Sequence, residues 1–152
     1  MFRKGALDDC KIIYNLICEM ECKQLPFDKF FNIYKKQVND KYYYCLVCER
    51  DDEVVGVLNL RFEEQLHHSE YIAEIMEFVI DPNYREKGIG KEMLAMACKI
   101  AKQFGCSQIE VASNQLRLDA HRFYLRECMQ NSHFKFSKPL VGLSGSKNEI
   151  GR

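Results

Sequence analysis

The chain has 152 residues, of which 47% are hydrophobic and 29% charged, and its 22 basic and 22 acidic residues give a formal net charge of zero. This composition is typical of a single globular domain rather than a disordered chain. The balanced charge argues against a broad surface for nucleic acid or anionic membrane, and no apolar run reaches the roughly 18 to 20 residues of a membrane span. No signal peptide opens the chain, so a cytoplasmic protein is expected.

Hydrophobic periodicity and turn signals predict an alternation of strands and helices. In chain order these are a strand at 2–4, a helix to about 23 that Asp8 or Asp9 can cap, a helix from Asp28, strands at 43–50, 54–62 and 71–80, a helix at 89–104, a strand at 109–112, a helix at 118–128 and a strand at 133–136. The apolar stripe of the second helix consists of Phe30, Phe31, Ile33, Tyr34 and Val38. This order predicts an α/β fold with a mixed sheet in one domain over residues 1–140, and a flexible tail at 141–152.

Two features of the predicted hairpin 43–62 need separate interpretation. Gly56 inside the second strand indicates a bulge or a close backbone approach. Cys45 and Cys48 have the spacing of a zinc or redox pair, but they lie on a strand, where residues three apart point to opposite faces. The chain's eight cysteines mostly lie within apolar patterns, which favours core packing over metal binding.

The stretch that follows the strand 71–80 predicts a binding site for a diphosphate. Asp81-Pro82 ends the strand, and the helix with apolar positions from Ile89 begins directly after Gly88. Amide groups at a helix N-terminus lack partners, and the helix dipole there favours negative charge. Gly88 and Gly90 allow the backbone to come close to a ligand, and Arg85, Lys87 and Lys91 add positive charge. An ordinary loop that begins a helix is the alternative interpretation.

The order strand, Asp-Pro, Tyr84-Arg85-x-x-Gly88-x-Gly90, helix resembles the acetyl-CoA motif of the GNAT superfamily of N-acetyltransferases. The resemblance implies the GNAT fold, in which a mixed, mostly antiparallel sheet with splayed central strands is flanked by about four helices. It also implies that acetyl-CoA is the acyl donor and that the strand end 78–80 supplies backbone N–H groups to it. The implied acetyl-CoA-binding residues are Phe78, Val79, Ile80, Arg85, Glu86, Lys87, Gly88, Ile89, Gly90, Lys91 and Asn114.

Segments outside this motif are similar to those of the aminoalkylphosphonate N-acetyltransferases. They are Leu16-Ile17-Cys18-Glu19, Glu53-Val54-Val55-Gly56, Leu66-His67-His68, Ala73-Glu74-Ile75-Met76-Glu77, the run 119–127 and the run 132–138. The similar segments occur in the same order over roughly residues 6 to 140, and they indicate the subfamily rather than the superfamily. One departure from the common superfamily pattern concerns Asn114. Ala120 and Tyr124 keep the usual spacing, but Gln115-Leu116-Arg117 form an apparent insertion between Asn114 and these two residues.

Acetyl transfer to an amine requires that the ammonium lose a proton and that the leaving thiolate gain one. The resemblance assigns the general acid to Tyr124 and offers Glu74, with Glu77 beside it, as the general base. Each of these residues also has an alternative interpretation. Tyr124 can be an ordinary tyrosine of an amphipathic helix, and the two glutamates can bind the substrate ammonium by charge or simply face solvent on an alternating strand.

A phosphonate group requires cations or a metal near the amine site. The candidate substrate-binding residues are His67, His68, His121, Arg122 and His133, with Arg117 and Arg126 also available. The acetyltransferases that the chain resembles are described as stimulated by divalent metal, but no ligand set with recognisable spacing is present. Superfamily members are often dimers, so a homodimer is a further expectation. The alternatives are an acetyltransferase for a polyamine, amino sugar or protein N-terminus, and a non-catalytic acyl-CoA-binding module.

Overall fold

The computed structural model describes residues 1–141, and the chain divides into two compact units, residues 1–112 and 113–152. The first unit contains β1 (Phe2–Lys4), η1 (Leu7–Asp9), α1 (Cys10–Glu21), α2 (Phe27–Val38), β2 (Tyr43–Arg50), β3 (Glu53–Gln65), β4 (Glu70–Ile80), η2 (Pro82–Tyr84), α3 (Ile89–Gln103) and β5 (Gln108–Val111). The described part of the second unit contains α4 (Leu118–Arg126).

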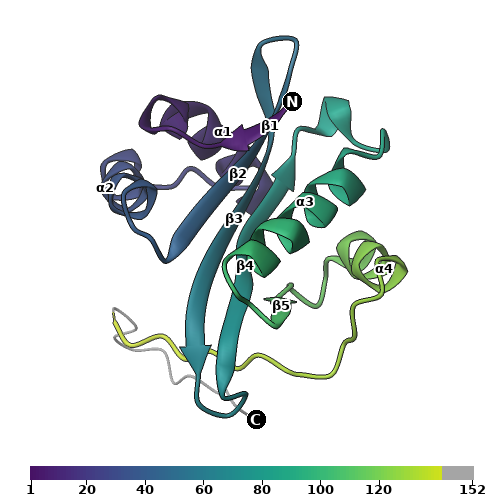
Figure 1. Ribbon diagram of the computed structural model, residues 1–152. Helices are drawn as coiled ribbons and strands as arrows, with labels where there is room; N and C mark the ends of the chain where they lie inside the picture. Colours follow the sequence, from purple (N-terminus) through teal and green to yellow (C-terminus); the bar gives the residue numbers. More distant parts are fainter. Residues whose placement is uncertain (142–152) are drawn as a thin grey trace. The chain divides into compact units, whose positions relative to one another are not determined.

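The five strands of the first unit form one sheet in the order β1-β2-β3-β4-β5 (Figure 1). The pairs from β1 to β4 are antiparallel, and β4 pairs with β5 in parallel. A parallel pair needs a crossover, which α3 provides between the two strands. The α/β class and the mixed, mostly antiparallel sheet predicted from the sequence are therefore confirmed.

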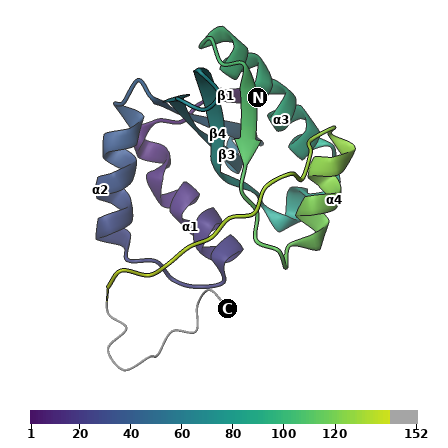
Figure 2. The ribbon, with the colours of Figure 1, turned by 90° about the horizontal axis from the view of Figure 1, so that it is seen from below.

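Helices cover both faces of this sheet. Figure 2 shows α1 and α2 on one face and α3 on the other, in agreement with the contacts of α1 with β3 and β4, of α2 with β2, and of α3 with β2 to β5. The core under α1 and α2 consists of Cys10, Ile13, Leu16, Ile17, Tyr34, Cys45, Val47, Val54, Val57 and Val79. Cys45 belongs to this core, whereas Cys48 pairs with Gly56 on the α3 face, so the two sulfurs lie on opposite faces as strand alternation predicts.

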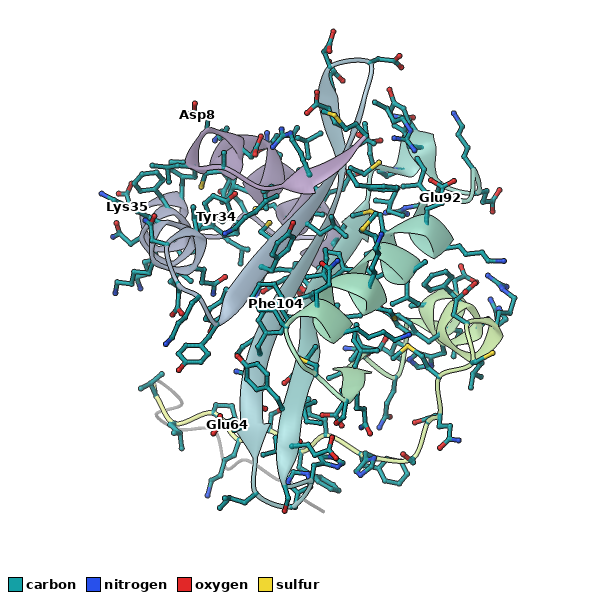
Figure 3. The ribbon with its side chains drawn as sticks, viewed as in Figure 1. Asp8, Tyr34, Lys35, Glu64, Glu92 and Phe104 are labelled. Carbon is teal, nitrogen blue, oxygen red and sulfur yellow. The ribbon has the colours of Figure 1, made fainter. Side chains whose placement is uncertain are left out.

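Three close contacts fix the helices on the sheet. Tyr34, labelled in Figure 3, lies between α2 and the sheet, and its buried hydroxyl donates to the carbonyl of Ala6 at 2.7 Å. On the other face, a Cβ added to Gly56 would lie 2.9 Å from the Met93 sulfur, so this glycine lets α3 approach the sheet closely. Phe104 at the end of α3 stacks on Phe62 with ring centroids 4.5 Å apart. The predicted close approach at Gly56 is therefore confirmed.

The predicted elements up to residue 128 are all present, with ends shifted by a few residues. One difference is functional: β3 continues to Gln65, beyond the predicted end at residue 62, so that Glu63 and Gln65 belong to the sheet. In α2 the predicted apolar stripe is narrower, because Ile33 is 56% exposed.

Asp9 occupies the N-cap position of α1 without making the predicted side-chain cap. Its carboxylate instead accepts hydrogen bonds from Arg3 at 2.8 and 3.0 Å and from the Ala6 N–H at 2.7 Å. A charged donor stabilises a carboxylate more strongly than a backbone amide does, so the ion pair decides the rotamer.

The predicted strand at 133–136 is wrong, since residues 130–140 have no regular secondary structure. A strand forms only when a neighbour satisfies its backbone groups, and the described sheet ends at β5. The predicted tail lies outside the described residues, apart from Val141. Within residues 1–141, no helix is long and apolar enough to cross a membrane.

Candidate functional site

The loop between β4 and α3 has the backbone geometry that the sequence predicts for an anion cradle. Gly88 is the N-cap of α3 with φ 80°, and Glu86 before it also lies in the left-handed region at φ 62°. A Cβ on Gly88 would meet nothing within 4 Å, so open space lies in front of this position. The first amides of a helix have no acceptor within the helix and carry the positive end of its dipole.

Cationic side chains surround this N-terminus, and one of them ties the loop to the end of β4. Arg85 is exposed and donates from Nε to the carbonyl of Ile80 at 3.0 Å. Lys87 lies over the Tyr84 ring at 5.2 Å from its centroid, and Lys91 is exposed in the first turn of α3. Ile89 is 4% exposed and anchors the helix start in the core. The cradle can therefore hold a diphosphate close to the edge of β4.

The edge of β4 beyond β5 carries the second feature. β5 ends at Val111, opposite Ile75, whereas β4 continues to Ile80. The Asp81 N–H donates to the Val55 carbonyl, so these two residues form a hydrogen-bonded pair of the β3–β4 ladder. Because hydrogen-bonded and non-hydrogen-bonded pairs alternate in an antiparallel ladder, Val57 and Val79 also form a hydrogen-bonded pair, and the pairs on either side of them do not. The backbone groups of Phe78 and Ile80 therefore point to the side where β5 has ended. Val79 points its backbone to β3 and is 5% exposed, so it serves the core.

A bulge in β4 places Glu74 and Glu77 on the same face of the sheet. Asn59 pairs with Glu77, but Leu60 pairs with Ile75, so Met76 is an extra residue without a partner in the register. Two residues three apart on a regular strand would point to opposite faces. Because of the bulge, Glu77 lies opposite Asn59 and Glu74 lies opposite Arg61. All four side chains lie on the sheet face of Val57 and Val79, over which α1 and α2 pack.

Glu77 is partly buried and held by an amide. Its Oε2 accepts a hydrogen bond from Asn59 Nδ2 at 3.0 Å. Burial raises the pKa of Glu77 above the usual range, the Asn59 hydrogen bond opposes this shift, and the negative charge of Glu21 adds to it. A carboxylate with a raised pKa is a better proton acceptor at neutral pH than an ordinary glutamate.

Glu74 lies in a network of opposite charges. Its Oε2 accepts from Arg61 Nη2 at 2.9 Å, and the same guanidinium nitrogen lies 3.3 Å from Glu63. Glu110 follows on β5 in register with Glu74, and it accepts a hydrogen bond from Gln108 at 3.1 Å. This part of the face therefore carries three carboxylates, two of which pair with Arg61.

The two histidines of the β3–β4 turn lie beyond this network. The rings of His67 and His68 lie tilted against each other with centroids 4.3 Å apart, and His68 Nε2 lies 3.9 Å from Glu110. Within residues 1–141, no three His, Cys, Asp or Glu side chains come together in a group that could hold a metal ion. The described side chains therefore offer no donor set that fits a bound metal.

The second unit holds the remaining residues predicted for the site. Tyr124 is partly buried on α4; burial raises the pKa of its phenol and the Arg117 charge opposes the shift. Asn114 accepts through Oδ1 from the Leu116 N–H at 2.9 Å, and its carbonyl lies 2.8 Å from His121 Nε2. Arg122 pairs with Asp119. His133 lies next to Ser132, with Nδ1 and Oγ 2.9 Å apart.

Sequence reasoning missed three polar residues of the β3–β4 face, namely Gln37, Asn59 and Arg61. Asn59 is 9% exposed, and with Asp9 it makes up the buried polar residues of the described chain. It lies in the apolar run 54–62, where a polar side chain that loses water needs a partner. That interruption was the signal that could have identified it.

Comparison with known proteins bears on this arrangement. Residues 9–128 match the profile described as "Acetyltransferase (GNAT) family". An aminoalkylphosphonate N-acetyltransferase from Salmonella typhimurium is 38% identical over 138 residues, which cover 91% of this chain and 90% of that protein.

Solved structures match the fold. A transcriptional regulator from Bacillus halodurans superposes with a TM-score of 0.85 at 23% identity, covering 92% of this chain and 99% of that one. A possible acetyltransferase from Clostridium difficile superposes with a TM-score of 0.79 at 21% identity, covering 93% and 97%. An aminoglycoside 6'-N-acetyltransferase from Acinetobacter haemolyticus gives 0.76 at 15% identity, covering 93% and 99%.

Proposed function

The chain belongs to the GNAT family of acetyltransferases, and on that premise we propose that it acetylates the amino group of an aminoalkylphosphonate with acetyl-CoA as donor. The observation that carries the choice of acceptor is the 38% identity to an aminoalkylphosphonate N-acetyltransferase over 91% of this chain. An N-acetyltransferase acting on a small amine is what the family itself implies.

The cradle and the edge of β4 provide the donor site in this proposal. The amides at the start of α3, together with Arg85, Lys87 and Lys91, hold the diphosphate of CoA. The Ile80 N–H points to the side where β5 has ended, so it is placed to hydrogen-bond the extended arm of the donor, whereas the Ile80 carbonyl accepts from Arg85. An amide N–H at this edge can polarise the thioester carbonyl as charge develops on its oxygen.

The acceptor amine attacks directly, without an acyl-enzyme. Acetyl-CoA supplies an acetyl group activated as a thioester. Amines of this kind are mostly protonated at neutral pH, with a pKa near about 10, so a base must first take a proton. Glu77 takes that role, since burial raises its pKa. The C–N bond forms, the C–S bond breaks, and the Tyr124 phenol gives its proton to the leaving thiolate.

Charge on the β3–β4 face supports a second candidate acceptor. Glu63, Glu74, Glu77 and Glu110 share this face with Arg61. An excess of carboxylates attracts a cationic molecule, which favours a di- or polyamine over a phosphonate. For a phosphonate acceptor, Arg61 and the predicted residues His67, His68, His121, Arg122 and His133 are the cationic candidates.

Release of CoA thiol from acetyl-CoA with a panel of amines tests the proposal. The panel contains aminomethyl-, 1-aminoethyl- and 2-aminoethylphosphonate, ethylamine as the match without a phosphonate, spermidine, glucosamine 6-phosphate and a short peptide, each with and without Mg²⁺. A kcat/KM for a phosphonate at least roughly 100-fold above that for ethylamine is expected, since a charged group with a cationic partner contributes about 3 kcal/mol. Preference for spermidine would favour the second candidate. A preference for the peptide, or rates with the phosphonates and spermidine that only equal the rate with ethylamine, would refute both.

A further inference from the structure

The side-chain amide of Asn59 connects helix α2 to Glu77. Its Nδ2 donates to Gln37 Oε1 at 2.9 Å and to Glu77 Oε2 at 3.0 Å. Asn59 is 9% exposed, so an amide without these partners would cost free energy. The three residues come from α2, β3 and β4, which are far apart in the sequence.

The hydrogen-bond chemistry fixes the direction of this chain of contacts. A primary amide carries two hydrogens on its nitrogen, and an ionised carboxylate can only accept. Both hydrogens of Asn59 Nδ2 are used, one by Gln37 and one by Glu77. Gln37 therefore fixes the orientation of the Asn59 amide, and that amide fixes Oε2 of Glu77. Within residues 1–141, the structure records no hydrogen bond to the other oxygen, Oε1.

We propose that Gln37 and Asn59 are positioning residues, which hold Glu77 so that Oε1 accepts the proton of the acceptor amine. The inference rests on the proposed function and adds two residues to it. Its consequence is that helix α2 determines the orientation of the general base. Glu74 is held differently, because its carboxylate forms an ion pair with the Arg61 guanidinium at 2.9 Å. Its negative charge therefore balances the positive charge of Arg61.

The groups around Glu77 determine how its titration responds to substitution. Asn59 and Gln37 are neutral, Glu21 at the end of α1 adds negative charge, and the Cys45 thiol on β2 senses the Glu77 charge. A donor to the charged form of a carboxylate lowers its pKa, and a nearby negative charge raises it. Removing the Asn59 donor therefore raises the pKa of Glu77, and a carboxylate in its place raises it further.

Three variants and a control test the inference in the intact protein. Asn59→Leu removes the donor with little change of volume, Asn59→Asp replaces the donor by a charge, and Gln37→Leu removes the outer contact. Asn32→Leu is the control, an exposed polar residue of the same helix exchanged for the same side chain. Urea denaturation confirms that each variant is folded at assay temperature.

The first readout is the pH profile of kcat/KM with the best amine of the panel. Its acidic limb reports the group that must be deprotonated. We expect the limb to move to higher pH in Asn59→Leu and further in Asn59→Asp, with a roughly tenfold fall of kcat at neutral pH, the size of one lost charge-assisted hydrogen bond. Gln37→Leu should move it in the same direction by less, and the KM for acetyl-CoA should not change. A lower kcat with the limb unmoved would mean a merely structural role and would overturn the proposal.

The second readout does not depend on turnover. In protein carrying ¹³C at the glutamate carboxyls, the Glu77 resonance is the one lost in Glu77→Gln, and its titration midpoint should rise in both Asn59 variants and stay in place in Asn32→Leu. An unchanged midpoint overturns the positioning of Glu77 by Asn59. If the midpoint rises but no amine of the panel is acetylated, the proposed function fails, while the connection from α2 to Glu77 stands.

Discussion

Replacing Gly88 by alanine distinguishes the effect of this residue on diphosphate binding from its effect on the stability of α3. Gly88 and Gly105 flank α3 with φ values of 80° and 82°, and a Cβ on either would meet nothing within 4 Å. Gly88→Ala and Gly105→Ala therefore impose the same backbone strain without a steric clash in the protein. Only Gly88 lies at the N-terminal end, where the proposed cradle offers its amides to the diphosphate.

The magnitudes differ between the two measured quantities. Alanine in the left-handed region costs about 1 kcal/mol of unfolding free energy, a fall of roughly 2 to 4 °C in Tm for a chain of this length. If the added methyl group prevents one amide from reaching the diphosphate, about 1.5 to 3 kcal/mol of binding energy is lost. The Kd for acetyl-CoA then rises roughly 10- to 150-fold.

Calorimetric titration with acetyl-CoA and urea denaturation measure the two quantities on the same protein samples. Equal losses of stability with weaker binding in Gly88→Ala alone are expected. Unchanged acetyl-CoA affinity in Gly88→Ala would refute the cradle. Equal weakening in Gly105→Ala would show that the affinity follows the stability of α3 rather than contact with the loop.

Three further variants have defined signs. Glu77→Gln should raise the free energy of unfolding at neutral pH by about 1 kcal/mol, since a buried charge is removed. Because the pKa of Glu77 is raised, the wild type gains stability as the pH falls through that pKa, so the urea midpoints of the two proteins should converge in acid. A difference in midpoint that stays constant over the pH series would contradict this. Asp9→Asn should cost about 2 kcal/mol at neutral pH. Because Arg3 and the Ala6 amide lower the pKa of Asp9, that loss should vanish as pH falls through the lowered value, and a difference persisting in acid would point to packing. Tyr124→Phe should lower kcat roughly 100-fold with the KM for acetyl-CoA unchanged, and an unaltered kcat would remove Tyr124 from the role of acid.

Local chemistry explains why so much of the fold could be predicted. The strand predicted at 71–80, its Asp-Pro stop and the helix after Gly88 depend on residues within a few positions of one another, so the sequence alone predicted these three elements. Asp9 shows the limit, because Arg3 from β1 competes for the carboxylate that local rules assign to a helix cap. The predicted strand at 133–136 failed for a related reason, since alternation indicates which face a strand buries but not whether a neighbour will pair with it.

The sequence by itself determined the class of protein, and it predicted the donor site and the two glutamates as candidates for the base. Only the tertiary structure decided how those glutamates are arranged. The extra residue Met76 brings Glu74 and Glu77 to one face, which depends on the register between β3 and β4. The difference between the two carboxylates then comes from their partners, Arg61 for one and Asn59 with Gln37 behind it for the other. Register and partnership between distant segments are properties of the packed chain, because they depend on which strands and helices bury their apolar faces together.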